Sequence, residues 1–470
     1  MEIRAKNEAV QLHLYHLSSL FFHERKDDFC ILLKEEDEKI IITLEKGEKT
    51  SLGEESVNLP LHKENQRAKK AALGKAFFKA TRAFTNYIPP YGLLFGVRPV
   101  KVPIFYRKNG YSIDETRRIL KEEFLVSSEK ADLLMGLCQK ELDFEKSIGS
   151  RDAMLYLSIP FCPSRCTYCS FISSSAPKHL SLIPEYLEKM REEMISTASL
   201  LQEKGRKISA VYMGGGTPGI LTPEQMELIL KTVREEFDLS SLREFTVEMG
   251  RPDTITQEKL SVLVQNGVDR ISINPQTTKN ETLERIGRRH SAKDFYSAMA
   301  LAKEFPTLSV NCDLIAGLPG EEPEDFLSSL EKVLSFEPAE VTLHALCRKR
   351  SAEKKEELSF TSAWQDAMKT AHKICINEGL SPYYLYRQKN AVSDLENTGF
   401  AGKGKIGVYN LAMMEDLCDI FAVGAGGIGK LLPKKEGDKI RRFPGFKYPF
   451  EYLSYPEKIQ EKLNEIKGLL

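Results

Sequence analysis

The sequence predicts an α/β protein: a partial (β/α)6 barrel of the TIM type, flanked by an N-terminal α+β domain and a C-terminal domain. Strand and helix signals alternate six times between residues 153 and 378, and such alternation implies a parallel sheet. Six units are fewer than the eight of a closed barrel, so the sheet is expected to stay open. A six-stranded doubly wound sheet is the alternative.

Residues 1–150 do not share this alternation. Val10, Leu12 and Leu14 alternate with polar residues, which predicts a half-buried strand. Apolar runs at 29–33 and 40–44 flank a charged segment and predict a hairpin. Helices are expected over about 66–84, 113–123 and 128–140. We interpret residues 1–150 as a separate domain.

Local patterns define the six units. Thr222 and Gln225 form a capping box that begins a helix, and Gly267 is expected to end the next one. Apolar runs predict strands that end at 159 and cover 210–213, 245–248, 270–273, 308–315 and 341–344. Helices are expected over 183–203, from 222, from 256, and over 292–305, 323–335 and 361–377. We place the barrel core in residues 151–350, and the last barrel helix with the C-terminal region in 351–470.

Composition excludes several classes of protein. The 470 residues contain 67 Lys+Arg and 67 Asp+Glu, so no net basic charge indicates a nucleic-acid partner. No apolar run is long enough for a membrane span, and the N-terminus lacks the apolar core of a signal peptide. Nine cysteines is a sparse and odd number, which argues against a disulfide framework. A cytoplasmic protein is expected.

Three cysteines follow the first predicted strand: Cys162, Cys166 and Cys169, with the spacing Cys-x3-Cys-x2-Cys. Three thiolates can hold three irons of a 4Fe–4S cube and leave the fourth iron open to a small molecule. A structural cluster usually has a fourth cysteine. A zinc site is the alternative, but structural zinc takes four ligands and the nearest histidine is the distant His179.

A glycine run, Gly214 to Gly216 followed by Thr217 and Pro218, comes after the second strand. Glycines allow a ligand close to the backbone and leave amides free to donate. A tight turn before a helix is the alternative, and a phosphate loop is excluded because the Gly-Lys-Ser/Thr ending is absent. The carboxyl ends of parallel strands share one face, so the cysteines and this run are expected to lie there together. The same face should carry Glu248, Gln276 and Asp313.

These features resemble the radical S-adenosylmethionine (SAM) superfamily. The segment from Tyr156 to Cys162, the glycine run, Gly287-Arg288 and the segment from Asp313 to Pro319 are similar to the HemN-like oxygen-independent coproporphyrinogen III dehydrogenases. This resemblance covers about 150 to 400. Residues 248–254, 273–277 and 385–390, with the long N-terminal extension, resemble the HemZ-type branch over nearly the whole chain.

The resemblance implies a set of cofactor ligands. Cys162, Cys166 and Cys169 would hold a 4Fe–4S cluster whose open iron binds SAM; the reduced cluster cleaves the sulfonium, and a 5′-deoxyadenosyl radical abstracts hydrogen. Tyr156, Gly215 and Glu248 would contact this SAM. The residues that would hold a second SAM are Gly216, Thr217, Gln276, Arg288 and Asp313.

The resemblance also implies the reaction. The substrate would be coproporphyrinogen III, whose propionates lose hydrogen, carbon dioxide and one electron to become the vinyl groups of protoporphyrinogen IX in haem biosynthesis. Flavodoxin or ferredoxin would be the reductant, and the C-terminal region would cover the substrate. Candidate partners of the tetrapyrrole are Arg348, Lys349, Arg350, Arg387, Lys389, Tyr383 and Tyr384.

Three departures from HemN-like enzymes leave two rival functions open. Ser158 replaces a histidine, Phe171 replaces a cysteine two positions past the trio, and Asn274-Pro275 replaces Gly-Val. The missing cysteine at position 171 makes the region of the cysteine trio more similar to that of the HemW-type haem chaperones. A haem carrier is therefore the first rival function. A radical SAM methyltransferase acting on a tetrapyrrole is the second.

Overall fold

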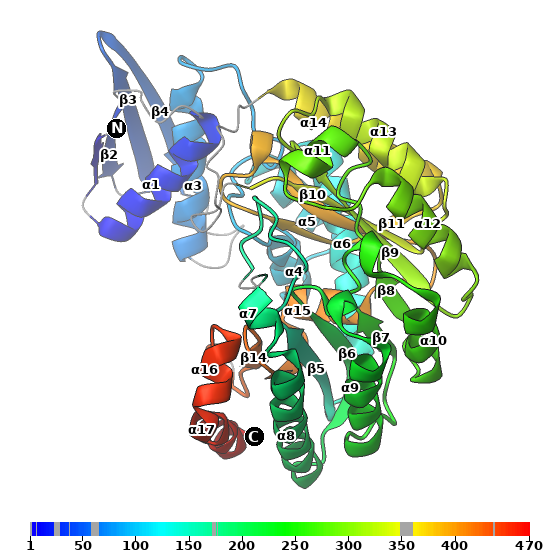
Figure 1. Cartoon of the computed structure of the whole chain (residues 1–470). Helices are drawn as coiled ribbons and strands as arrows, with labels where there is room; N and C mark the ends of the chain where they lie inside the picture. Colours follow the sequence, from blue (N-terminus) through cyan, green and yellow to red (C-terminus); the bar gives the residue numbers. More distant parts are fainter. Residues whose placement is uncertain are drawn as a thin grey trace. The chain divides into compact units, whose positions relative to one another are not determined.

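The computed structural model divides the chain into two compact units, Met1–Leu142 and Asp143–Leu470 (Figure 1). It describes residues 2–5, 7–22, 29–36, 38–57, 65–171, 175, 177–347, 361–435 and 438–470. Each unit has its own sheet and its own buried core.

The first unit is an α+β fold. Its sheet has the order β1-β2-β3-β4, and the expected hairpin of β2 and β3 is confirmed. The strands are β1 (Glu2–Arg4), β2 (Phe29–Glu36), β3 (Lys39–Lys46) and β4 (Lys49–Ser56). The helices are α1 (Glu8–Phe21), α3 (Asn65–Thr81), α4 (Lys101–Lys108), α5 (Ile113–Glu122) and α6 (Ser128–Lys146). Leu17, Ile42 and Phe77 are fully buried between sheet and helices.

The strand predicted at Val10–Leu14 is wrong, because this segment lies in α1. The buried positions are Leu14, Leu17, Ser18, Leu20 and Phe21, and Leu14, Leu17, Ser18 and Phe21 follow the i, i+3, i+4, i+7 spacing of a helix, while Leu12 is exposed. Asn7 caps the helix, since its side chain accepts from the Ala9 N–H at 2.8 Å. Three alternating apolar residues were too short a pattern to separate period 2 from period 3.6.

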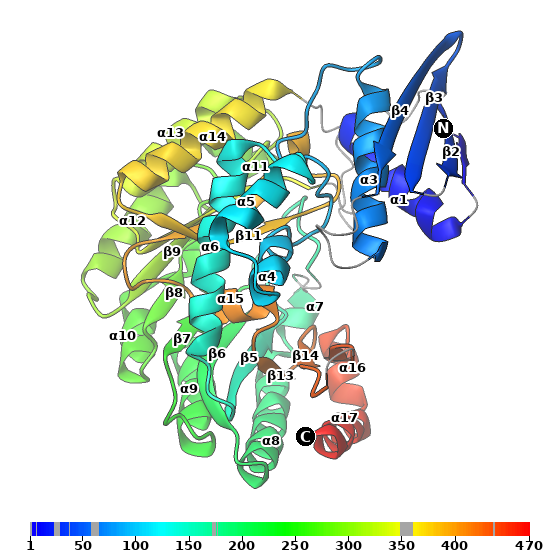
Figure 2. The ribbon, with the colours of Figure 1, turned by 180° about the vertical axis from the view of Figure 1, so that it is seen from behind.

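The six predicted βα strands form the parallel centre of the sheet of the second unit, so the expected fold class is confirmed. They are neighbours in chain order: β5 (Asp152–Ile159), β6 (Lys207–Gly215), β7 (Glu244–Val247), β8 (Arg270–Ser272), β9 (Ser309–Ala316) and β10 (Glu340–Ala345). The helices between them cover the outer side (Figures 1 and 2): α8 (Ile183–Glu203), α9 (Pro223–Glu236), α10 (Gln257–Gln265), α12 (Ala292–Lys303), α13 (Pro323–Leu334) and α14 (Ser362–Asn377).

Later strands extend this sheet at both ends instead of forming a layer of their own. β12 (Glu396–Ala401) pairs antiparallel with β10, and β11 (Ser381–Arg387) pairs with β12. At the other end β13 (Asp419–Val423) runs parallel to β5. The hairpin β14 (Ile428–Leu431) and β15 (Arg441–Pro444) follows. The sheet therefore has eleven strands in the order β11-β12-β10-β9-β8-β7-β6-β5-β13-β14-β15.

One helix lies inside the curve of this sheet. α15 (Val408–Glu415) packs against both β6 and β11, which are far apart in the strand order. The sheet must therefore curve around it. Its Tyr409 ring stacks on Tyr212, with centroids 4.7 Å apart, and on Tyr156, at 6.1 Å.

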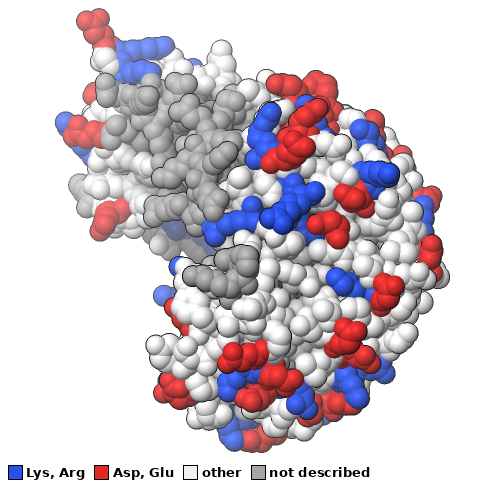
Figure 3. All heavy atoms as spheres, in the orientation of Figure 1, with Lys and Arg blue, Asp and Glu red and all other residues white. Residues whose placement is uncertain are grey.

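The surface carries both signs of charge. Lys and Arg side chains lie beside Asp and Glu across the visible face of the second unit (Figure 3).

Two further helices, α16 (Pro449–Ser454) and α17 (Pro456–Leu469), pack on α8. None of the helices within the described residues is both long enough and apolar enough to cross a membrane.

Candidate functional site

A cavity of about 220 Å³ lies at the carboxyl ends of the parallel strands. It is lined by every predicted site residue except Tyr156: Cys162, Cys166, Cys169, Gly215, Gly216, Thr217, Glu248, Gln276, Arg288 and Asp313. A larger cavity of about 880 Å³ lies at the opposite ends of β5 and β13 and includes none of them. The predicted residues therefore share one face, as strand-end positions in a parallel sheet should.

The cysteine loop is held by short contacts. The Thr217 hydroxyl donates to Cys162 Sγ at 3.4 Å, and Arg251 Nη2 donates to Cys166 Sγ at 3.1 Å. The Ser164 hydroxyl donates to the carbonyl of Gly287 at 2.9 Å. Across the described residues, no three His, Cys, Asp or Glu side chains converge on a single metal ion. In a 4Fe–4S cube each thiolate binds a different iron, so the sulfurs need not meet at one point.

The electrostatics of the loop suit a thiolate-bound cluster. Burial alone raises the pKa of Cys166, but the positive charges of Arg288 and Arg251 outweigh it, and the net shift is downward. Arg251 Nη1 and Arg288 Nε are buried donors that have no protein hydrogen-bond partner. The cysteine trio, with two guanidinium groups beside Cys166 that have spare donors, fits a 4Fe–4S cluster with an anionic ligand on it.

The glycine loop packs directly on the cysteine loop. Gly216 N–H donates to the carbonyl of Ile159 at 2.8 Å, and Thr217 N–H donates to that of Phe161 at 2.7 Å. A Cβ on Gly216 would lie 2.4 Å from the Phe161 carbonyl oxygen. Gly215 has φ +108°, a backbone conformation that glycine adopts easily and that residues with a Cβ rarely adopt. These glycines bring the end of β6 against the cysteines.

Glu248 and Asp313 have opposite pKa shifts. Burial and the neighbouring Asp313 charge raise the pKa of Glu248 to about 7. Burial also raises the pKa of Asp313, but His344 and a hydrogen bond from Asn311 Nδ2, at 2.9 Å, lower it on balance. Asp313 is therefore ionised near neutral pH, while Glu248 is poised to change its charge there.

Gln276 has an uncommon backbone conformation. Its φ is +67°, and it is held there by pairing with β9: its N–H donates to the Asp313 carbonyl at 2.9 Å, and its carbonyl accepts from the Ile315 N–H at 3.0 Å. A non-glycine residue in this region is strained by the order of 1 kcal/mol. In this conformation Gln276 lines the cavity together with Asp313.

Further residues line the cavity without a role assigned from the sequence, among them Arg251, Asn274, His344, Tyr386 and Asn397. For two of them the sequence contains some indication of a role. Arg251 lies in the segment that is similar to the HemZ-type branch, and Tyr386 lies in a polar cluster after the barrel. Asn397 gave none, since its strand, β12, returns antiparallel from outside the βα alternation.

Other predicted contacts lie away from this cavity. The Tyr156 ring stacks between α15 and β6 and does not line it. Tyr383 and Tyr384 are buried and bond to Glu340 and Thr342. Arg387 and Lys389 also do not line it. Successive residues of an extended segment face opposite sides. Tyr386 and Gln388 therefore line the cavity, whereas their neighbours Arg387 and Lys389 do not. Arg348, Lys349 and Arg350 lie outside the described residues.

Comparisons with known proteins agree with this geometry. The family model described as Radical SAM superfamily matches residues 156–333. An oxygen-independent coproporphyrinogen-III oxidase-like protein HemZ from Bacillus subtilis is 32% identical, over 96% of this chain and 94% of its own length. A haem chaperone HemW from Haemophilus influenzae is 29% identical over 66% of this chain and 77% of its own. The solved HemN coproporphyrinogen III oxidase from Escherichia coli superposes with a TM-score of 0.54 at 22% identity, covering 68% of this chain and 72% of the other.

The cavity, the cysteine spacing and these matches define a radical SAM protein, a class whose members use a 4Fe–4S cluster and SAM. Within that class, the chain belongs to the HemZ-type branch of the HemN-like family. The likeness to solved HemN supports the fold alone.

Proposed function

We propose that this protein is an oxygen-independent coproporphyrinogen III dehydrogenase that converts propionate side chains into vinyl groups for haem biosynthesis. The observation that carries this proposal is the single cavity in which three cysteines, the glycine loop and Glu248, Gln276, Arg288 and Asp313 meet. The similarity to the HemZ protein over nearly the whole of both chains supports the same reaction.

We assign the cofactor ligands within this proposal as follows. Cys162, Cys166 and Cys169 hold the cluster, and together with SAM it supplies the one-electron chemistry that begins the reaction. Glu248 accepts from the SAM ammonium group. Tyr156, which does not line the cavity, supports the neighbouring strands β5 and β6 through its ring stack on Tyr212. Arg288 and Gln276 line the place of a second SAM, with Asp313 accepting from its ribose.

The proposed reaction balances at each propionate. A hydrogen atom passes from the β-carbon to the 5′-deoxyadenosyl group of SAM, giving 5′-deoxyadenosine; the carboxylate then leaves as carbon dioxide, one electron passes to a one-electron acceptor, and the remaining two carbons form a vinyl group. A low-potential electron donor, flavodoxin or ferredoxin, is the proposed partner in the cytoplasm.

The test is an anaerobic assay with coproporphyrinogen III, SAM and a chemical reductant. Vinyl product with 5′-deoxyadenosine is expected. S-adenosylhomocysteine without vinyl product would instead identify a methyltransferase.

A haem carrier is the second candidate. Two observations favour it: the similarity to HemW chaperones and the exposed Phe171, which is 66% accessible where HemN-like enzymes have a cysteine. A carrier would bind haem stoichiometrically and release no decarboxylated product. The same assay, with haem binding followed by absorbance, separates the two functions.

A further inference from the structure

His344 lies on β10 in the wall of the cavity, between side chains from three other strands. Its Nδ1 is 3.2 Å from Asn397 Oδ1 and 3.4 Å from the Tyr386 hydroxyl. Its Nε2 is 3.7 Å from Asp313 Oδ2. These neighbours determine which ring nitrogen carries hydrogen.

The orientation of the Asn397 amide is fixed by the backbone. Asn397 Oδ1 accepts from the Ala345 N–H at 3.1 Å, and its Nδ2 donates to the Tyr386 carbonyl at 3.4 Å. An amide oxygen only accepts, so the His344 Nδ1 that faces it carries the hydrogen. In the neutral ring the lone pair is then on Nε2.

Nε2 therefore faces another acceptor. Asp313 Oδ1 already accepts from Asn311, and its Oδ2, the oxygen nearest Nε2, is an acceptor whenever the carboxyl group is ionised. Two acceptors 3.7 Å apart repel each other unless a hydrogen lies between or beside them. Either the ring takes up a proton, or a bound ligand supplies the donors.

We propose that His344 Nε2 and Asp313 Oδ2 form a paired-acceptor subsite that binds two adjacent O–H or N–H donors of the ligand. This inference rests on the proposed function for the identity of that ligand. The ribose diol of SAM presents adjacent O–H donors, and the pyrrole N–H groups of the proposed tetrapyrrole present the same chemistry.

Two substitutions of His344 distinguish its role as a hydrogen-bond acceptor from a role as a cation. His344→Gln retains an acceptor at the end of the side chain but cannot become charged, whereas His344→Leu removes both properties. His372→Gln is the matched control, because His372 Nε2 lies 3.6 Å from Glu396 Oε1 outside the cavity.

The experiment uses the full chain with its cluster reconstituted anaerobically. SAM affinity is measured without tetrapyrrole, and KM and kcat are then measured with coproporphyrinogen III. His344→Leu is expected to weaken one ligand about tenfold, whereas His344→Gln stays within about threefold of the wild type. Weaker SAM binding assigns the subsite to the ribose; a raised KM with unchanged SAM affinity assigns it to the pyrroles.

Three results would overturn the inference. In the first, His344→Leu changes neither ligand. In the second, His344→Gln loses as much ligand affinity as His344→Leu, which would indicate that the His344 ring acts as a cation. In the third, His372→Gln produces the same loss. Wild-type protein that binds SAM but makes no vinyl product would refute the proposed function, while the SAM measurements would still decide the role of His344.

Discussion

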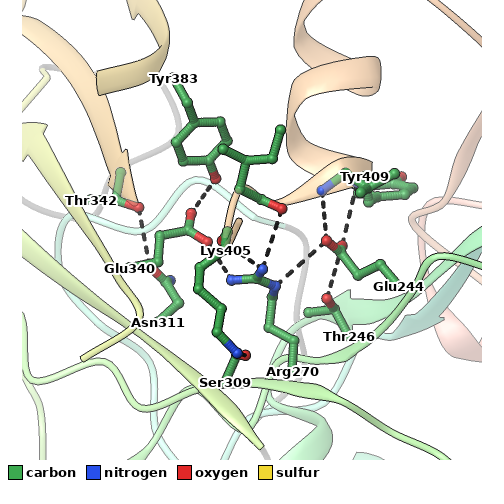
Figure 4. A network of polar contacts seen from close by, with 12 residues as sticks. Glu244, Thr246, Arg270, Ser309, Asn311, Glu340, Thr342, Tyr383, Lys405 and Tyr409 are labelled. Carbon is green, nitrogen blue, oxygen red and sulfur yellow. Dashed lines mark hydrogen bonds and ion pairs between the residues drawn. The ribbon is translucent and has the colours of Figure 1, made fainter. Parts of the chain in front are cut away.

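Arg270 Nη1 donates to Glu340 Oε2 at 2.7 Å, with both side chains buried inside the curved sheet (Figure 4). Arg270 Nη2 also donates to the Lys405 carbonyl at 2.7 Å, and its Nε lies 3.5 Å from Glu244 Oε2. Glu244 in turn accepts from the Val408 N–H, the first residue of α15, at 2.6 Å. This ionic network ties the amino ends of three strands to the helix inside the curve.

Replacing Arg270 should strongly destabilise the second unit. Arg270→Met leaves the buried carboxylates Glu244 and Glu340 without their cation, which costs about 3–5 kcal/mol of unfolding free energy. The matched control is Lys231→Met, whose partner Glu235 is 3.7 Å away on an exposed helix face, and it should cost less than about 1 kcal/mol. Denaturant unfolding measures both, and equal small losses would contradict a structural role for the network.

Stability should depend on pH through Glu248. Its pKa rises from an ordinary 4.5 to about 7 on folding. The native state therefore holds this proton more tightly, so the stabilisation is complete below about pH 4.5 and is lost as pH rises through about 7. Glu248→Gln should flatten this part of the curve of unfolding free energy against pH in SAM-free protein. An unchanged curve would mean that Glu248 keeps an ordinary pKa.

Gly216→Ala should separate the glycine loop from the cysteine loop. The new Cβ would meet backbone atoms of Phe161, which cannot rotate away, so about 1–3 kcal/mol of stability should be lost together with much of the iron content. Gly136→Ala in α6 is the control, because no atom lies within 4 Å of its Cβ position, and it should gain about 0.5–1 kcal/mol. Iron retained in full by Gly216→Ala would argue against this loop contact.

Gln276→Gly should stabilise the fold while weakening ligand binding. Glycine relieves the positive φ, worth about 1 kcal/mol, but removes the side chain from the cavity. Glu337→Gly, at φ +56° away from the cavity, should give a similar gain with unchanged SAM affinity. If Gln276→Gly bound SAM and substrate like the wild type, the side chain would have no role in the site.

Single cysteine variants test the ligand set of the cluster. Cys162→Ala, Cys166→Ala and Cys169→Ala should each abolish the cluster absorbance after anaerobic reconstitution. Cys347→Ala is the discriminating control, because Cys347 lines the same cavity and its Sγ lies 2.9 Å from the Lys389 carbonyl oxygen. A full cluster in this variant is expected. Loss of the cluster would make Cys347 a fourth ligand and close the open iron.

The sequence was most informative where local chemistry decides structure. The capping box of Thr222 and Gln225 marks the start of α9, and the residues after strand ends come together because parallel strands share a direction. The site was less predictable where it depends on distant pairing. Asn397 reaches the cavity only because β12 returns antiparallel beside β10, a register that no local pattern specifies.

The pairing of β13 with β5 has a consequence for biosynthesis. β5 ends at Ile159, but its partner on one side begins at Asp419, some 260 residues later in the chain. While the ribosome makes the intervening segment, one edge of β5 has no strand beside it and offers bare backbone groups to other chains. Nascent chains should therefore need protection, by a chaperone or by slow release, until β13, in the last ninth of the chain, has emerged.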